Sequence, residues 1–595
     1  MLNNFKWMKF RDYFLVFSFA CAFIFGICGY IYADESAGAD EDDLQSMEVS
    51  KNMAEGRAKS PAITILKNRK EMMPHPVLPE GKIMIRQILV SGSTLLADQA
   101  IDNIKTDFEN QELTAKQMQR CVDLINRAYS REGYISSYAY VIPDKISEGV
   151  LEIRVVEGRT GKIEIKGNKF YSEEFIRSRI SLKEGQPFNF RQLNRDLFKI
   201  NKHPDRKVSV VLDSDKESNS TNITLTVKDR TPWHTVAQWD NYGAEAILYN
   251  RYKLFLTHNN VSGHDDSLTA KVEWAEGDAH KIYDLDYNLP LNDKWKFEFY
   301  ILPYKSEDYY YKDNKDTDFE KRARKFYFWF YQSLISEPNI DLVSSYGFTY
   351  FDIFWYKPYD EYMERTKQDC FRILKWDLSL NRVDKYGRWV ITNDLQKALP
   401  NLWAGVKVKA DMCSVPGAKG NYVKDLLTVA RRQKITSDID FVGKFRWQLS
   451  SATLTGVNAF SAGGYCGVID NRGFPRTQAP ADSGQAVNLG FTFPAYFVPK
   501  NINVPYSKTK LYDDLKLFTF WDDARAVLKS PKLASNPSDP NDKKVVNLRS
   551  VGFGVTFTVP DQNLSIRVDC GFPLSAQTPK DGDHTHTWIS VTKGF

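Results

Sequence analysis

The chain has 595 residues, a formal net charge of +5 at pH 7 and a mean hydropathy of -0.45. This hydropathy excludes a membrane protein built from many apolar helices, but not a membrane β-barrel, in which only alternate residues are apolar. The positive charge is spread along the chain in short runs such as Lys321 to Lys325, which we interpret as solvated loops. Nucleic-acid binding is therefore not indicated.

The N-terminus has the pattern of a secretory signal peptide over residues 1–33. Lys6, Lys9 and Arg11 precede an apolar run over 13–32, and Ala33 comes just before acidic residues. We predict export and cleavage after this segment, with an uncleaved anchor helix as the alternative because Ile31 is bulky for a cleavage site. Residues 34–82 are expected to form a polar leader and linker, with a short helix over 43–58.

Two segments, 83–158 and 159–230, repeat the order strand, helix, helix, strand, strand. Apolar residues at helical spacing, such as Met118, Cys121 and Ile125, predict the second helix of the first segment. The sequence predicts strands over 83–90, 136–142, 150–156, 161–167, 206–212 and 222–227, and helices over 97–104, 114–131, 172–180 and 189–200. Two tandem α+β units of about 70–75 residues indicate an internal structural repeat.

From residue 231 onward the pattern changes to strict alternation. Val551, Phe553 and Val555 alternate with Gly552 and Gly554, and aromatic residues make up 14% of the chain. A strand of this kind is apolar on one face and small or polar on the other, as in a barrel with lipid outside and a polar lumen. Residues 231–595 suit ~16 such strands, and a sheet of that size must close or split.

Several motifs in this region resemble the two-partner secretion transporters, the TpsB family of haemolysin secretion/activation proteins. The family motifs F-S-x-G-G, V-R-G-F/Y and F-x-D-x-G are similar to Phe460-Ser461-Ala462-Gly463-Gly464, Asp470-Asn471-Arg472-Gly473-Phe474 and Phe520-Trp521-Asp522-Asp523-Ala524. Trp239-Asp240-Asn241-Tyr242-Gly243 and Gly571-Phe572-Pro573-Leu574 resemble the family's first and last strands. Asn471 replaces the usual Val, and Ala524 replaces Gly.

The resemblance implies a mainly β fold: two small α+β POTRA domains followed by a sixteen-stranded antiparallel transmembrane barrel, with a lid loop around 465–484. It also implies that Arg472 of the lid pairs with Asp522 of the barrel wall. The residues support this, because Phe520 and Asp522 share one face of a strand and Asp523 lies on the other. Gly473 suits a tight loop tip, and Phe474 can pack on the wall. Phe460, Gly463 and Gly464 are the expected strand motif of the lid loop.

The C-terminus has the pattern of a barrel-assembly signal. Ile589, Val591 and Phe595 share one face of the last predicted strand, and Lys593 on the same face departs from an all-apolar signal. The resemblance implies that the barrel-assembly machinery reads this face during biogenesis. The expected location is the outer membrane, with outer-membrane lipid around the barrel and the POTRA domains in the periplasm.

The resemblance implies a transporter that recognises a secreted TpsA-type exoprotein through its POTRA domains and moves it unfolded to the cell surface. An insertase of the same superfamily is the alternative. We expect no enzyme, because H-E-x-x-H, G-x-S-x-G and P-loop motifs are absent. We expect no catalytic residue, cofactor or metal site, since His584 and His586 are only a weak pair and no C-x-x-C occurs. One disulfide can form among Cys121, Cys370, Cys413, Cys466 and Cys570.

Overall fold

The computed structural model divides the chain into two compact units, one running from Ala58 to Pro232 and the other containing Trp233–Phe595. It describes residues 63–65, 76, 78–79, 81–215, 219–243, 249–276, 280–310, 317–359, 362–400, 402, 413–415, 417–418, 420–455, 458–464, 471–476, 478–529 and 545–595. The predicted signal peptide and leader helix lie outside these residues. No helix in the described ranges has the length and apolar character needed to cross a membrane.

The first POTRA-like unit contains one strand more than predicted, and its first strand is divided. The expected strand over 83–90 is wrong as a single element, because the chain breaks at Arg86 into two strands. Ile85 and Ile88 are both fully buried, and a period-two strand cannot bury residues three apart on one face. The elements are β2 (Lys82–Ile85), β3 (Gln87–Ser91), α3 (Asp98–Thr106), β4 (Gln111–Thr114), α4 (Ala115–Arg131), β5 (Tyr138–Ile142), the 3-10 helix η2 (Pro143–Glu148) and β6 (Val150–Val156).

Helix α4 forms where its spacing predicts, and it lies in the core of this unit. Thr114 and Gln117 form a reciprocal capping box at its start. Met118, Cys121, Val122, Ile125 and Tyr129 are buried against the three-stranded sheet β3-β6-β5, while β2 pairs with the unpredicted β4. Burial raises the pKa of the Cys121 thiol to about 12, so this cysteine stays protonated and unreactive.

The second α+β unit has the same order of helices and strands that the sequence predicts, and its sheet also includes a strand from the leader segment. It contains β7 (Arg159–Lys166), α5 (Glu173–Ser178), α6 (Phe190–Ile200), β8 (Arg206–Asp215) and β9 (Ser220–Asp229). Strand β1 (Ile63–Ile65) pairs in parallel with Val210–Leu212 of β8, which gives the sheet order β1-β8-β9-β7. The three residues Ile-Thr-Ile in a polar leader are too short to carry a strand signal of their own, so this edge strand could not be predicted.

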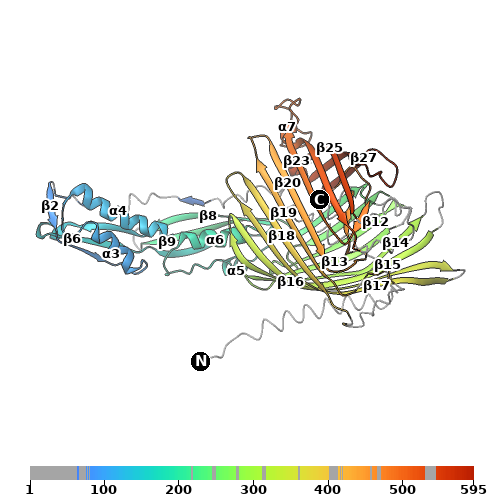
Figure 1. Cartoon of the computed structure of the whole chain (residues 1–595). Helices are drawn as coiled ribbons and strands as arrows, with labels where there is room; N and C mark the ends of the chain where they lie inside the picture. Colours follow the sequence, from blue (N-terminus) through green and yellow to red (C-terminus); the bar gives the residue numbers. More distant parts are fainter. Residues whose placement is uncertain are drawn as a thin grey trace. The chain divides into compact units, whose positions relative to one another are not determined.

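In the described part of the second compact unit, sixteen antiparallel strands form a closed barrel in which β10 pairs with β27 (Figure 1). The strands are β10 (Trp233–Asp240), β11 (Arg251–His258), β12 (Ser267–Ala275), β13 (His280–Pro290), β14 (Trp295–Tyr310), β15 (Thr317–Glu337), β16 (Ile340–Tyr359), β17 (Tyr362–Val383), β18 (Gly387–Ala398), β19 (Val423–Lys434), β20 (Asp440–Ser450), β23 (Ser483–Pro494), β24 (Leu515–Val527), β25 (Val545–Val559), β26 (Leu564–Pro573) and β27 (His586–Gly594).

Four of these strands are much longer than the roughly ten residues that we expected from barrels in general. Strands β14 to β17 have 16, 21, 20 and 22 residues. The interpretation of Lys321 to Lys325 as a solvated loop is therefore wrong, because these residues lie within β15. The run pairs in register with both neighbouring strands; Lys325, for example, lies opposite Leu302 of β14 and Phe351 of β16.

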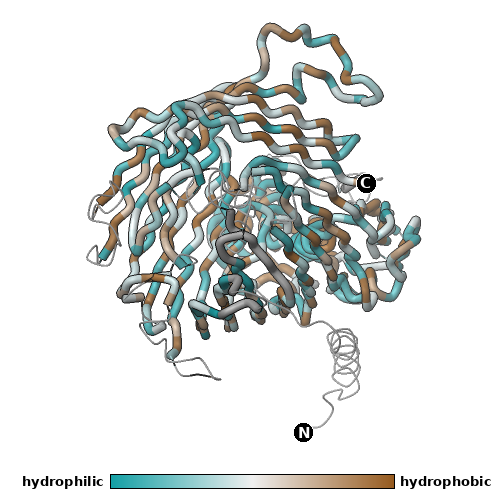
Figure 2. The backbone as a smooth tube through the Cα atoms, turned by 90° about the vertical axis from the view of Figure 1, so that its right-hand side faces the viewer, coloured by the Kyte–Doolittle hydropathy of each residue, from teal (hydrophilic) through white to brown (hydrophobic). Residues whose placement is uncertain are grey.

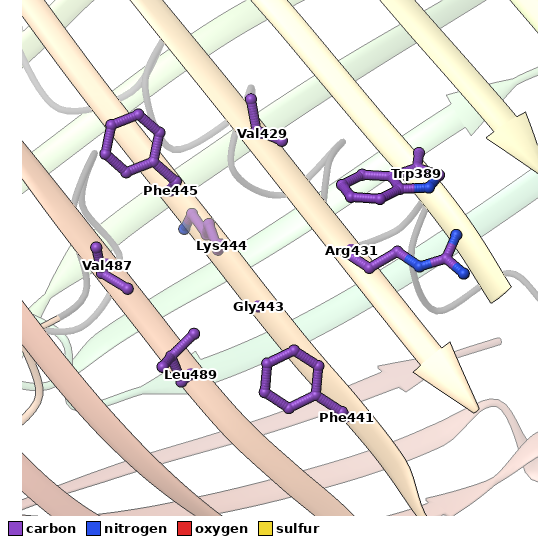
Figure 3. A pocket seen from close by; sticks show the side chains of 9 residues that line it. All are labelled: Trp389, Val429, Arg431, Phe441, Gly443, Lys444, Phe445, Val487 and Leu489. Carbon is purple, nitrogen blue, oxygen red and sulfur yellow. The ribbon is translucent and has the colours of Figure 1, made fainter. Parts of the chain in front are cut away.

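Strands β23, β24 and β25 follow the predicted alternation, with an apolar outward face and a lumen face that combines polar and small residues with the rings of Phe518 and Phe520. Asp522 pairs with Asn488 and Ser550 on the lumen face, so Leu489, Trp521 and Val551 face outward. Hydrophobic and hydrophilic residues alternate along the strands in Figure 2. A shallow cavity of about 190 Å³ opens on the outer face where Gly443 has no side chain (Figure 3). It belongs to the outward surface of the barrel.

A half-buried carboxylate joins the end of β6 to the start of the loop after β3. Glu157 accepts hydrogen bonds from the backbone amides of Thr94 (2.6 Å) and Leu95 (2.9 Å), and from the Tyr129 hydroxyl (2.8 Å). Burial alone would raise the pKa of Glu157, but these hydrogen bonds outweigh it and lower the pKa below its ordinary value.

We predict that Glu157→Gln loosens the loop at 93–96 at neutral pH, because a neutral amide oxygen accepts hydrogen bonds from Thr94, Leu95 and Tyr129 more weakly than the carboxylate does, by about 1 kcal/mol each. The stabilisation exists while the carboxylate is charged and is lost as pH falls through its lowered pKa, so the difference from wild type should shrink in acid. Hydrogen–deuterium exchange of the Thr94 and Leu95 amides in the full chain measures this. Glu148→Gln, at an exposed position, is the control, and its Thr94 and Leu95 amides should exchange at the wild-type rate.

Candidate functional site

The candidate site is the lid loop between β20 and β23, which lies against the lumen face of the barrel wall. The loop contains a small hairpin of β21 (Phe460–Ala462) and β22 (Ala479–Ala481). Gly463 and Gly464 follow with φ of 110° and 89°, values that L side chains rarely adopt. Gly464 then pairs with Asn471 through two backbone hydrogen bonds. The Phe474 amide donates to the Asn471 carbonyl at 3.1 Å, so Arg472 and Gly473 are the central residues of a turn over 471–474, which we call the tip of the lid.

Arg472 and Asp522 form a buried bidentate ion pair. The Arg472 side chain is 9% exposed and that of Asp522 is fully buried. Arg472 Nη2 lies 2.7 Å from Asp522 Oδ1, and Nε lies 2.9 Å from Oδ2, which also accepts the Arg472 backbone amide at 3.1 Å. Asn488 donates to Oδ1 at 2.9 Å. Asp522 thus accepts four hydrogen bonds, three of them from one lid residue.

A second buried aspartate completes the charge balance, and sequence reasoning missed it. Arg472 Nη1 donates to Asp569 Oδ1 at 3.1 Å, and Asp569 is also fully buried. Arg567, two residues earlier on β26, binds the same carboxylate at 2.7 Å and 2.8 Å. Two arginines therefore face two aspartates. Arg567 and Asp569 alternate with the apolar Ile566 and Val568 in the sequence, and this period-two pattern was the available signal.

An aromatic ring and small residues let the guanidinium approach the wall closely. The Arg472 guanidinium carbon lies 3.5 Å from the centre of the Phe520 ring, which fits a cation–π contact. Phe520 lies opposite Gly552 on β25, where any added Cβ would overlap that ring. Because Gly552 has no side chain, the Phe520 ring can occupy the space in front of it. The two residues therefore position Arg472 together.

The tip of the lid touches the last three strands through its backbone. Gly473 donates its amide to Ser550 Oγ at 3.2 Å, and Trp588 Nε1 donates to the Arg472 carbonyl at 2.8 Å. A Cβ on Gly571 would overlap the Arg472 carbonyl group, and a Cβ on Gly473 would lie 2.8 Å from the Phe572 carbonyl carbon. These two glycines are required by the close approach of lid and wall.

Apolar packing holds the base of the lid. Phe474 and Phe460 are fully buried, in one cluster with alanines of the lid and of strands β23 and β24. Ala524, which stands where the family pattern has Gly, is 2% exposed in this cluster. The small alanines leave room for the two phenylalanine rings, so Phe474 does pack on the wall.

Asn471 stands where the family pattern has Val. Its polar side chain is buried, but both its nitrogen and its oxygen form hydrogen bonds. Its Nδ2 donates to the Leu548 carbonyl at 3.0 Å, and its Oδ1 accepts from Ser550 Oγ at 2.9 Å. The substitution therefore adds two hydrogen bonds between the lid and β25. A buried amide with both ends satisfied costs little and fixes the position of the loop.

The predicted assembly residues lie apart from the lid, at the seam between the first and last strands. Ile589 and Val591 are on β27, which pairs with β10, and Phe595 is 73% exposed. Asn241 closes the seam, since it donates to the Thr587 carbonyl (2.8 Å) and accepts from the Ile589 amide (2.7 Å). Lys593 does not extend into lipid; its ammonium group donates to the Gln562 carbonyl.

The described residues contain no group of three or more His, Cys, Asp or Glu arranged to hold a metal ion. His586 binds Asp581 at 2.9 Å. Cys121, Cys370, Cys413 and Cys570 form no disulfide within the described ranges, and Cys466 lies outside them.

Comparisons with known protein families give a consistent assignment along the chain. Residues 219–507 match the family described as "Haemolysin secretion/activation protein ShlB/FhaC/HecB". Residues 83–158 match the ShlB-type POTRA domain, and residues 159–230 match a POTRA profile described as a surface antigen variable number repeat.

Among curated proteins, the outer membrane transporter CdiB of Dickeya dadantii is 22% identical over 40% of this chain and 43% of that protein. CdiB of Escherichia coli is 26% identical over 31% of each chain, and the hemolysin transporter protein HpmB of Proteus mirabilis is 26% identical over 29% of this chain and 30% of that protein. The chain thus spans less than half the length of these relatives in the matched regions.

Among solved structures, CdiB from Escherichia coli superposes with a TM-score of 0.69 at 18% identity, covering 94% of this chain and 99% of that one. CdiB from Acinetobacter baumannii gives 0.62 at 12% identity, covering 93% and 98%. BamA from Haemophilus ducreyi lacking POTRA domains 1–3 gives 0.51 at 14% identity, covering 87% and 100%. At these identities the likeness concerns the fold.

We predict that Asp522→Asn weakens the docking of the lid, because it leaves Arg472 buried with one of its two counter-charges removed. Breaking a buried pair in this way costs about 3–5 kcal/mol. Single-channel recordings in planar bilayers should show a larger open fraction than wild type.

Asp523→Asn is the matched control, since Asp523 lies on the opposite face of the same strand and pairs with the exposed Arg549. The open fraction of this variant in single-channel recordings should equal that of wild type. Unchanged conductance in Asp522→Asn would contradict a docking role for the pair.

A steric test leaves every charge in place. Gly571→Ala should displace the lid, because the new Cβ would overlap backbone atoms of Arg472 that cannot move without moving the tip. Trypsin should then cleave after Arg472 in the folded barrel, and mass spectrometry of the fragments detects this. Gly443→Ala on the outer face, whose nearest neighbour is a Phe441 ring atom at 3.2 Å, should remain as resistant as wild type.

Proposed function

Since the chain belongs to the TpsB family of two-partner secretion transporters, we propose that it exports one specific partner polypeptide, a TpsA-type exoprotein, unfolded across the outer membrane. The barrel lies in the outer membrane, with the POTRA domains in the periplasm. The observation that carries the proposal is the buried contact of Arg472 with Asp522 inside a closed barrel, because it gives the lumen a removable lid.

The lid works as a two-state element in this proposal. In the closed state, Arg472 binds Asp522 and Asp569, Phe520 packs under the guanidinium group, and Phe474 is buried beside the wall. We call Arg472, Gly473, Phe474, Phe520 and Asp522 the latch. An unfolded chain can pass only after the lid leaves this position, so the arriving partner must favour the undocked state.

Docking of the partner would use the edges of the POTRA sheets. The pairing of Ile63–Ile65 with β8 supports this mode, because it is an extended segment added to a POTRA edge by main-chain hydrogen bonds. An extended segment of the partner would pair with a POTRA edge in the same way, and side chains of alternate residues would supply specificity.

We further propose that transport needs no covalent chemistry and no cofactor in this chain. The latch is an ion pair with packing around it, and it contains no nucleophile with an adjacent base. Folding of the emerging partner outside the cell would supply the driving force. During biogenesis, the barrel-assembly machinery would read the outward residues Ile589, Val591 and Phe595.

An insertase is the second candidate, because the fold is also shared with BamA at a TM-score of 0.51. The two functions differ in how many other proteins are affected when this protein is removed. A dedicated exporter serves one client, whereas an insertase serves many barrels.

We predict that deleting this protein leaves a single large exoprotein in the periplasm and removes it from the culture medium. Quantitative proteomics of periplasm, outer membrane and medium measures this, with porin levels as the control for barrel assembly. Complementation with Asp523→Asn should restore export fully. General loss of outer-membrane barrels would identify an insertase and overturn the proposal.

A further inference from the structure

The connection between β23 and β24 is unlike the other described connections at its end of the barrel. It runs over residues 495–514 and contains the short helix α7 (Leu511–Asp514), which lies at the rim of the barrel beyond the strands (Figure 1). Strand order places it at the end where β10 begins and β27 ends, which is the periplasmic end. Connections there such as 291–294, 338–339 and 384–386 are short turns.

This connection is a folded structure with its own small core. Ala495, Val498 and Tyr512 are buried together. Asn503 and Lys510 pair across the segment, and Lys510 Nζ donates to Asn503 Oδ1 at 2.6 Å. A segment of this length is usually kept only when it has a function, and here it is ordered as well.

The neighbouring turn between β25 and β26 fixes the position of this connection. Ser507 Oγ donates to Asp561 Oδ1 at 2.6 Å, and the Lys508 amide donates to Oδ2 at 2.8 Å. Gln562 Nε2 donates to the Pro505 carbonyl at 3.0 Å. The hydrogen bonds from Ser507 and Lys508 hold the pKa of Asp561 below its ordinary value, so the anchoring carboxylate is charged at neutral pH.

Large apolar side chains nevertheless point away from this core. Phe497 is 76% exposed, Tyr496 58%, and Tyr506 fully exposed. Tyr506 also has φ of 58°, whereas the other described non-glycine residues with positive φ are Asn or Asp. An aromatic residue in that conformation is strained, and the loop holds it where its ring meets only the surrounding medium.

Tyr496 continues the lipid-facing surface of the barrel. Leu489, Phe491 and Phe493 form the outward column of β23, because Asn488 faces the lumen. The Phe493 ring stacks on Tyr496 with centroids 6.3 Å apart and an interplanar angle of 9°. The column therefore runs without a break from the wall into the connection.

Basic residues accompany the aromatic ones. Lys500 and Lys508 are exposed on the same segment, and the Lys500 ammonium lies 4.9 Å from the centre of the Tyr512 ring. Aromatic rings with lysines beside them favour the membrane–water interface, where the rings enter the boundary and the ammonium groups reach headgroup phosphates.

We propose that residues 495–508, the interface anchor, seat Tyr496, Phe497 and Tyr506 in the headgroup region of the periplasmic leaflet. The occupant of this surface is lipid, because the surface extends the lipid-facing column of β23. The anchor would hold β23 and β24, which carry Asn488 and Asp522 of the lid contact, at a fixed depth in the membrane. This inference depends on the location of the barrel and not on which polypeptide it exports.

Spin labels test the proposal in the full chain. Phe497→Cys and Tyr506→Cys are labelled one at a time in a variant whose native cysteines are Ser, and reconstituted in phosphatidylethanolamine–phosphatidylglycerol vesicles. Collision with oxygen, which concentrates in lipid, is compared with collision with a water-soluble nickel chelate. Ser437→Cys, exposed in the turn after β19 at the same end, is the matched control.

We expect labels at 497 and 506 to collide with oxygen several-fold more than the control does, and with nickel several-fold less. Nickel access equal to that of Ser437→Cys would overturn the proposal, since the rings would then lie in water. Protection from both reagents would overturn it too, because a protein surface would be covering them. Ile502→Cys, 43% exposed on the same segment, provides an independent position if a labelled variant assembles poorly.

Discussion

The lid depends on one fully buried carboxylate, that of Asp522. A buried charge is tolerable only when its acceptor capacity is used, and Asp522 receives three hydrogen bonds from Arg472 and one from Asn488. Only the lid can supply the first three, because no other described residue is within bonding distance with a comparable set of donors. Undocking therefore requires water to take the place of Arg472 on both Asp522 and Asp569. In the proposed function, that exchange would separate two discrete states, since partial withdrawal would leave Arg472 and Asp522 unpaired while both are still buried.

The neighbouring small residues follow from the same requirement. Arg472 reaches Asp522 only if the tip backbone lies directly on β25 and β26, and Gly571 and Gly473 allow this approach. Phe520 supports the guanidinium group from beneath, and Gly552 leaves room for its ring. The alternation of glycine with valine and phenylalanine on β25 thus serves two surfaces. Its apolar side meets lipid, and its glycine side leaves space for an aromatic ring and the lid.

Periodicity and motif together predicted most of this arrangement, and the parts they missed have physical reasons. Period-two patterns identified the faces of β25, β26 and β27, because every barrel strand meets lipid on one side. The placement of Arg472 against Asp522 came from a family resemblance and from the shared face of Phe520 and Asp522. The roles of Asp569 and Trp588 needed the register between distant strands, which a single sequence does not contain. The break at Arg86 was overlooked although the spacing of Ile85 and Ile88 shows it, whereas β1 has no local signal.

The lid and the closure of the barrel are coupled through β27. Trp588 donates to the Arg472 carbonyl, and its ring contacts that of Tyr242, which follows Asn241 at the end of β10. Asn241 in turn bonds to β27 on both sides of Trp588, at Thr587 and Ile589. A docked lid therefore braces the first and last strands at the place where they join. The seam between β10 and β27 has five paired residues on each strand, fewer than any other pair of neighbouring strands in the described barrel. Loss of this brace would therefore weaken the part of the wall that has the fewest paired residues. In the proposed transport, release of the lid would clear the lumen and would also remove this brace from the seam.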